Sequence, residues 1–71
     1  MTYFTSFFLD TEKDIIVSLY KDMDSLHYVL ETPNHHTGNL IRNLARICNL
    51  PLSQNDEGRL IIRGEVPCYV A

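Results

Sequence analysis

Two cysteines and three histidines are the residues of this chain best suited to chemistry, because together they could bind a metal ion or form a cysteine–histidine catalytic pair. They are Cys48, Cys68, His27, His35 and His36. A zinc site needs about four such ligands, normally in pairs two to four residues apart, and neither cysteine has a close partner. A cysteine nucleophile needs a base that a third group orients, and no motif in the sequence identifies one. We therefore expect no enzymatic activity, no metal site and no cofactor.

The cysteine count and the hydropathy pattern bear on the cell compartment. Two cysteines in 71 residues are too few for the disulfide framework of a secreted domain. We expect reduced thiols, with Cys48 buried on a helix face, although a disulfide to Cys68 is an open alternative. No apolar run approaches the ~18 residues of a membrane span, and no basic residue precedes Lys13 as it would in a signal peptide. These features favour one small domain, residues 1–71, in the cytoplasm and away from the membrane.

The arginines all lie in the second half of the chain, at Arg42, Arg46, Arg59 and Arg63. If the helix face and the strand face that carry them adjoin, the guanidinium groups could line a surface for an anion such as a phosphate backbone. The chain as a whole is acidic, with a formal net charge of −3, which favours solvated arginines that pair with nearby carboxylates. A small nucleic-acid-binding regulator is therefore the alternative function rather than the leading one.

The first half of the chain is acidic, with two lysines against six aspartates and glutamates in residues 1–36. Asp14 and Asp22 fall on the polar side of a predicted helix, with Glu12 and Asp24 at its margins. Such a face could meet a basic partner surface or imitate phosphates, since charge complementarity confers specificity. A solvated helix face is the competing interpretation.

Aromatic residues concentrate near the N-terminus, at Tyr3, Phe4, Phe7 and Phe8. In a strand they would present apolar groups on both faces, and a small domain covers only one face easily. The uncovered face would be a contiguous apolar patch of the kind that marks a protein interface, and a symmetric homodimer is one way to bury it. A central strand that is covered on both sides is the other interpretation.

The order of the secondary-structure elements follows from the spacing of apolar residues. The β-branched and aromatic content of residues 2–9 predicts a strand. Residues 11–31 carry apolar side chains at helical spacing, which predicts a helix. The same segment also allows two strands, 15–20 and 26–32, that turn at the sequence KDMDS, and this alternative stays open.

The second half of the chain predicts one more helix and a hairpin. Residues 39–50 place their apolar side chains on one broad face, and Asn49 can end the helix in a left-handed conformation. Gly64 can take the positive φ of a tight turn, so residues 59–63 and 66–70 are predicted as two strands. The predicted fold is α+β, in the order β-α-α-β-β: a small three-stranded antiparallel sheet with two helices packed on one face.

Residues 43–50 resemble the first helix and turn of a helix-turn-helix DNA reader, with Ala45 as the small packing residue and Asn49 in the turn. The following residues, 51–58, show no apolar periodicity and bring two carboxylates toward the phosphates. The recognition helix is missing, so we do not assign this motif.

The leading prediction is a non-enzymatic protein–protein interaction module, an adaptor or inhibitor of another protein. Its contacts would come from the acidic helix face or from the N-terminal aromatic strand. A hydrophobic interface of this kind should resist salt, whereas phosphate binding should weaken steeply with salt.

Overall fold

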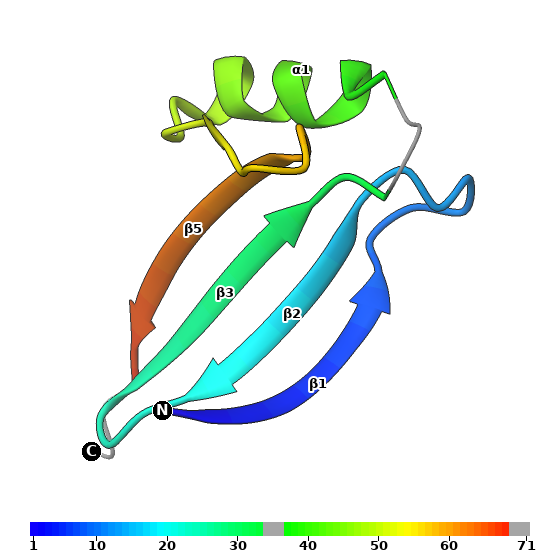
Figure 1. The fold of residues 1–71 in the computed structure, drawn as a ribbon. Helices are drawn as coiled ribbons and strands as arrows, with labels where there is room; N and C mark the ends of the chain where they lie inside the picture. The colour runs from blue at the N-terminus through cyan, green and yellow to red at the C-terminus, as the bar shows by residue number, and fades with distance from the viewer. Residues whose placement is uncertain (34–36, 69–71) are drawn as a thin grey trace.

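The computed structural model describes residues 1–33 and 37–68, and within them it forms one antiparallel sheet and one helix (Figure 1). The elements, in chain order, are β1 (Thr2–Phe8), β2 (Ile16–Lys21), β3 (Ser25–Glu31), α1 (Asn39–Cys48), β4 (Ser53–Gln54) and β5 (Leu60–Pro67). The strands lie side by side in the order β1-β2-β3-β5-β4. The long strands β1 and β5 therefore flank a central hairpin, and β1 and the two-residue β4 form the two edges of the sheet.

The helix predicted for residues 11–31 is wrong, because this segment forms the hairpin of β2 and β3. Its two strands pair in register, with Val17 opposite Leu30. Between them the chain turns at Asp22, whose backbone N–H donates to the carbonyl of Ser25 at 3.0 Å and whose carboxylate accepts from the backbone N–H of Met23 at 2.9 Å. The aspartate therefore supplies the turn that glycine or proline usually marks.

The predicted arrangement of three strands and two helices is also wrong, because the described residues contain five strands and a single helix. The strand predicted for residues 2–9 is confirmed by β1, and the helix predicted for 39–50 is confirmed by α1. The hairpin at Gly64 is wrong, because β5 runs through this residue without a turn. Of its predicted second strand, 66–70, the last two residues lie outside the described part of the chain.

The ends of α1 are set by two residues with positive φ. Gly38 precedes the helix with φ 78°, and Asn49 follows it with φ 53°. The backbone N–H of Asn49 donates to the carbonyl of Ala45, as in other left-handed C-caps. The predicted left-handed conformation of Asn49 is thereby confirmed.

The hydrophobic core lies between α1 and one face of the sheet, which we call the helix face. The buried cluster consists of Ile15, Val17, Leu30, Ile41, Ala45, Leu60 and Ile62. Three of its members are cross-strand neighbours on β2, β3 and β5, and two lie one turn apart on α1. The opposite side of the sheet, the open face, carries no helix in the described part of the chain.

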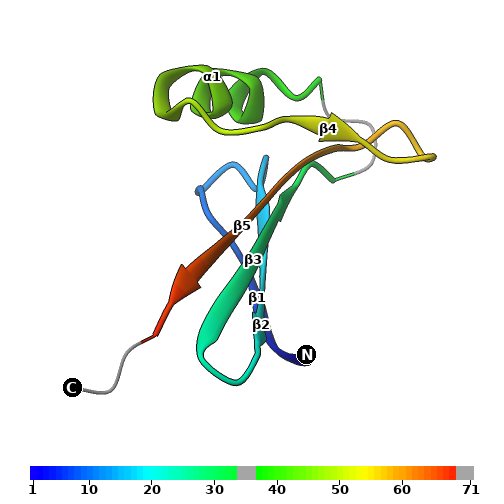
Figure 2. The same cartoon turned by 90° about the vertical axis from the view of Figure 1, so that its left-hand side faces the viewer.

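The helix covers one end of the sheet and leaves the other end uncovered. Figures 1 and 2 show α1 lying across the end where β3 finishes and β5 begins, while the turn between β2 and β3 and the start of β1 project away from it. The Cα atoms span 41 × 26 × 23 Å, which reflects this elongation. Apolar side chains at the projecting end therefore have no helix to pack against among the described residues.

Candidate protein interface

Strand β1 carries aromatic side chains on both faces, and a β-bulge determines which of them share a face. Tyr3 pairs with Tyr20 of β2 and Thr5 pairs with Leu19, so Phe4 is the extra residue between them. A bulge shifts the alternation of side chains by one position. As a result Tyr3 and Phe8 lie on the open face, and Phe4 and Phe7 lie on the helix face.

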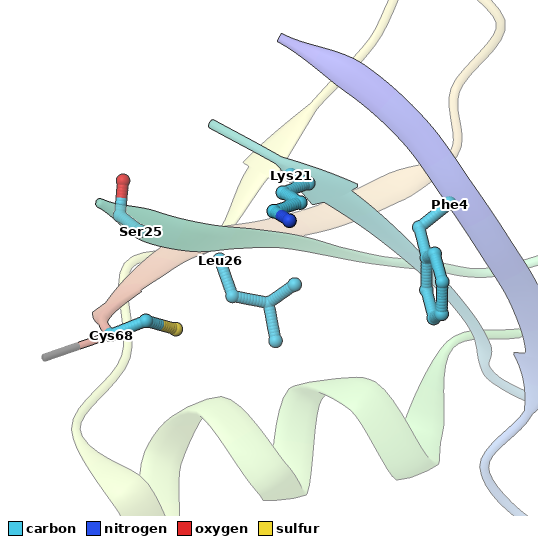
Figure 3. Close-up of a pocket in the computed structure, with 5 residues that line it drawn as sticks. All are labelled: Phe4, Lys21, Ser25, Leu26 and Cys68. Atoms are coloured by element: carbon cyan, nitrogen blue, oxygen red, sulfur yellow. The ribbon is translucent and has the colours of Figure 1, made fainter. Parts of the chain in front are cut away.

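On the helix face Phe4 borders an open groove of about 290 Å³ at the uncovered end of the sheet. Figure 3 shows Phe4 and Leu26 projecting from the sheet toward the side on which α1 lies. The groove is lined by Phe4, Lys21, Ser25, Leu26 and Cys68. Its floor is apolar and the Lys21 side chain is the charged group in its lining, so it suits a hydrophobic side chain better than a polar ligand.

On the open face Tyr3 is fixed by neighbouring side chains. Its ring meets the ring of Tyr20 edge to face, with 5.6 Å between the centroids. Its hydroxyl lies 2.7 Å from the hydroxyl of Ser6, which in turn lies 2.9 Å from that of Ser18. These contacts hold the ring in one orientation, which lowers the entropy that a partner would have to remove on binding.

The aromatic side chains of β1 are exposed to an unusual degree for an ordered strand. The exposed fractions are 57% for Tyr3, 70% for Phe4, 46% for Phe7 and 45% for Phe8. The strand contains neither a charge nor a proline, although proteins commonly protect sheet edges with such residues. The other edge of the sheet is protected by its shortness, because β4 has only two residues. Strand β1 is therefore an apolar edge strand that is interrupted by one bulge, with the Lys13 ammonium over the Phe8 ring at 5.5 Å from its centroid.

The acidic helix face does not exist, because Asp14 and Asp22 lie at opposite ends of β2. Asp14 stands in the loop before this strand and Asp22 in the turn after it. The backbone N–H of Met23 and the nearby His27 ring lower the pKa of Asp22. This carboxylate lies 3.5 Å from the His27 imidazole. The Asp22 carboxylate stabilises the turn between β2 and β3, and the two aspartates do not form one surface.

The structure does not bring the four arginines together. Arg59 forms ion pairs with Glu31 at 3.2 Å and with Glu57 at 3.4 Å. Arg63 follows the buried Ile62 in β5 and therefore lies on the open face. The remaining two, Arg42 and Arg46, are exposed on α1, which packs on the helix face. The helix arginines and Arg63 thus lie on opposite sides of the sheet.

The cysteines and histidines do not form a site in the described part of the chain. Cys48 and Cys68 are both exposed free thiols, so the predicted burial of Cys48 is wrong. His27 belongs to β3 rather than to a helix, and its Nε2 lies 3.3 Å from the hydroxyl of Ser25. His35 and His36 lie outside the described residues. Residues 1–33 and 37–68 contain no group of three potential metal ligands, and their helix is too short to cross a membrane.

Leu26 is the residue of this surface that sequence reasoning missed. The helix predicted for residues 11–31 does not place it in a surface with β1, whereas in the structure it lines the groove beside Phe4. The alternation of Leu26, Tyr28 and Leu30 was the available signal, because it belongs to the two-strand alternative for this segment. The alternation alone does not show that β2 pairs with both β1 and β3, and this pairing is what brings Leu26 close to Phe4.

Comparisons with known proteins add no further information about this surface. No protein-family model matches the chain, and neither the curated proteins nor the solved structures include a significant match. Strand β1 and its surroundings therefore carry the functional inference by themselves.

Proposed function

We propose that the protein is a non-enzymatic interaction module that binds another protein chain through β1 and the apolar groove beside it. The observation that carries this proposal is the exposure of four aromatic side chains on an uncharged edge strand. An edge strand offers unpaired backbone groups to an added strand, and flanking side chains give the contact its specificity. Aromatic anchors are also the residues most enriched among those that dominate binding energy.

The proposal differs from the prediction made from the sequence in its choice of surface. The acidic face is removed from consideration because its two aspartates are separated by the length of β2. The aromatic strand is retained, and the groove with Leu26 is added to it. An interface of this composition gains its free energy from apolar burial, which depends little on salt.

A pair of matched variants tests this function. Phe4→Lys places a charge on β1, whereas Ile47→Lys places the same charge at a similarly exposed apolar position on α1, 73% exposed against 70%. A partner captured from extracts of the natural source should bind the wild type and the Ile47→Lys variant. We expect Phe4→Lys to weaken its Kd at least about tenfold, as for an aromatic hot spot.

Calorimetry with the purified partner completes the test. The affinity for the wild type should change little between about 50 and 200 mM salt, the range in which phosphate contacts weaken strongly. Equal binding of both lysine variants would show that β1 is not the interface. A steep loss of affinity with salt would show that charge, and not the aromatic edge, carries the interaction.

A further inference from the structure

We infer that the occupant of the β1 edge is a second copy of this chain, which pairs antiparallel with β1 about a two-fold axis at Ser6. This inference rests on the proposed function and names the partner of the same surface. It would join the two five-stranded sheets into one continuous sheet.

The charge distribution permits self-association at this edge. A two-fold axis brings each residue close to residues of the same strand, so any net charge on that strand would be repelled by its own copy. Residues Thr2–Phe8 carry no charge, although the chain as a whole has a formal charge of −3. The acidic turn at Asp22–Asp24 and the loop at residues 10–14 lie beyond the two ends of the strand. The edge is therefore the place where two copies can approach without like charges in contact.

The order of residues in β1 is symmetric about its centre. Two aromatic residues, Tyr3 and Phe4, are followed by two hydroxyl residues and then by two aromatic residues, Phe7 and Phe8. In an antiparallel pair about Ser6, Phe7 lies opposite Thr5 of the second copy and beside its Phe4, and Phe8 lies opposite the bulge formed by Tyr3 and Phe4. An isologous interface requires this self-complementarity of one patch.

The bulge at Phe4 places these partners on matching faces. In a regular strand, residues 4 and 7 would lie on opposite faces. The bulge moves Phe4 to the helix face with Phe7 and leaves Tyr3 on the open face with Ser6 and Phe8. The aromatic contacts between the copies are therefore formed on matching sides of the joined sheet. On the helix face Phe7 contacts Phe4, which lies beside the facing Thr5, and on the open face Phe8 contacts Tyr3.

The exposed area is sufficient for a small specific interface. A buried aromatic side chain removes about 150–250 Å² from solvent, so the exposed fractions of the four rings correspond to roughly 400 Å² in each copy. Complete burial of these rings in both copies would remove about 800 Å² from solvent, and the backbone edge and Leu9, which is 50% exposed, would add to this. The buried area of the dimer would then be on the order of 1,000 Å², which is about the smallest area expected for a specific protein interface.

Sedimentation of the full chain, from low micromolar to near-millimolar concentration, tests the association itself. We expect a reversible dimer for the wild type and for Ile47→Lys, and a dissociation constant at least about tenfold weaker for Phe4→Lys. Circular dichroism establishes that each variant is folded. A dimer that survives Phe4→Lys unchanged would overturn the inference, because the edge would then not be its interface.

Disulfide trapping tests the register independently of any charged variant. With Cys48 and Cys68 both replaced by serine, Ser6→Cys places two thiols across the proposed axis, where facing residues have Cα atoms about 4.5–5.5 Å apart, within the range of a disulfide. Mild oxidation should give a covalent dimer. The matched variant Thr2→Cys, far from the axis on the same strand, should remain monomeric on a denaturing gel. Failure of Ser6→Cys to form the dimer, or equal trapping by Thr2→Cys, would contradict the register.

The outcomes separate this inference from the proposed function. If the wild type stays monomeric at every concentration and the Phe4→Lys variant no longer binds a foreign partner, the second copy is refuted and the proposed interaction module stands. If neither self-association nor partner binding responds to Phe4→Lys, both the inference and the proposed function fail.

Discussion

The ring of Tyr28 on β3 lies over Gly64 on β5, in the space that a β-carbon at position 64 would occupy. The two residues are direct cross-strand partners. Gly64 has no positive φ, so the backbone does not require glycine there. The glycine is needed because the tyrosine ring covers it, an arrangement in which an aromatic residue compensates for a glycine in a sheet.

Replacement of Gly64 by alanine should therefore destabilise the fold although the backbone conformation suits any residue. The added methyl group collides with the Tyr28 ring, which is partly buried against the hydrophobic core and must move away from it. We expect a loss of about 1–3 kcal/mol, as for other overpacked sites, measured by urea unfolding. In a Tyr28→Ala background the same Gly64→Ala change should cost much less. Equal costs in the two backgrounds would show that the ring is not the cause.

This pair also explains why the tail was predicted as a hairpin. Glycine in a sequence indicates a turn because it tolerates positive φ, but it also indicates a close approach of another group. Only the register of β3 with β5 distinguishes the two, because it places Tyr28 opposite Gly64. This pairing joins residues far apart in the sequence, so no local pattern could reveal it.

The hairpin of β2 and β3 was mistaken for a helix for a different physical reason. Central strands of this sheet have apolar side chains at both odd and even positions, as at Ile16 and Val17. When both faces carry apolar groups, the alternation that indicates a strand disappears and helical spacings arise by chance. Helix α1 was predicted correctly because its apolar face is one-sided, with Ile41 and Ala45 buried and Arg42 exposed.

The candidate interface was predictable only where it depends on one segment. The aromatic cluster of β1 is contiguous in sequence, so its exposure on a strand could be expected. The acidic surface depended on the helix assignment and disappeared with it. The groove between Phe4 and Leu26 joins β1 to β3 across β2, and a single sequence does not contain that relationship.

Two isoleucines of α1 should respond very differently to the same small change. Ile41 is fully buried against the sheet, whereas Ile47 is 73% exposed on the same helix. Ile41→Val removes one buried methylene group and should cost about 0.5–1.5 kcal/mol. Ile47→Val should stay within about 0.5 kcal/mol of the wild type. Urea unfolding of both variants is the measurement. A larger cost at Ile47 would mean that this side of α1 is covered by a partner.

Duplex DNA should not bind through the arginines. Arg59 is engaged with Glu31 and Glu57, and Arg63 is separated from the helix arginines by the sheet. Too few guanidinium groups share one surface to neutralise a row of phosphates. An amide-resolved NMR titration with mixed-sequence duplex at about 50 and 200 mM salt should show no movement. Shifts at the four arginines that fade at the higher salt would instead establish the nucleic-acid-binding alternative.

Asp10 should make the stability of the fold depend on acid. Partial burial is the largest single influence and raises its pKa. The backbone N–H groups of Asp14 and Ile15 donate to its carboxylate at 2.9 and 3.0 Å. Together with other backbone groups they lower the pKa by more than burial raises it, so the pKa lies below its ordinary value of 3.8. Because the pKa is lower in the folded state, the carboxylate stabilises the fold above the unfolded pKa. This contribution is lost as the pH falls through the folded pKa.

Urea midpoints of the wild type should therefore drop between about pH 5 and pH 2. The Asp10→Asn variant keeps an acceptor oxygen but cannot titrate, so its midpoint should drop less. Equal drops for both proteins would exclude Asp10 as a source of the acid sensitivity.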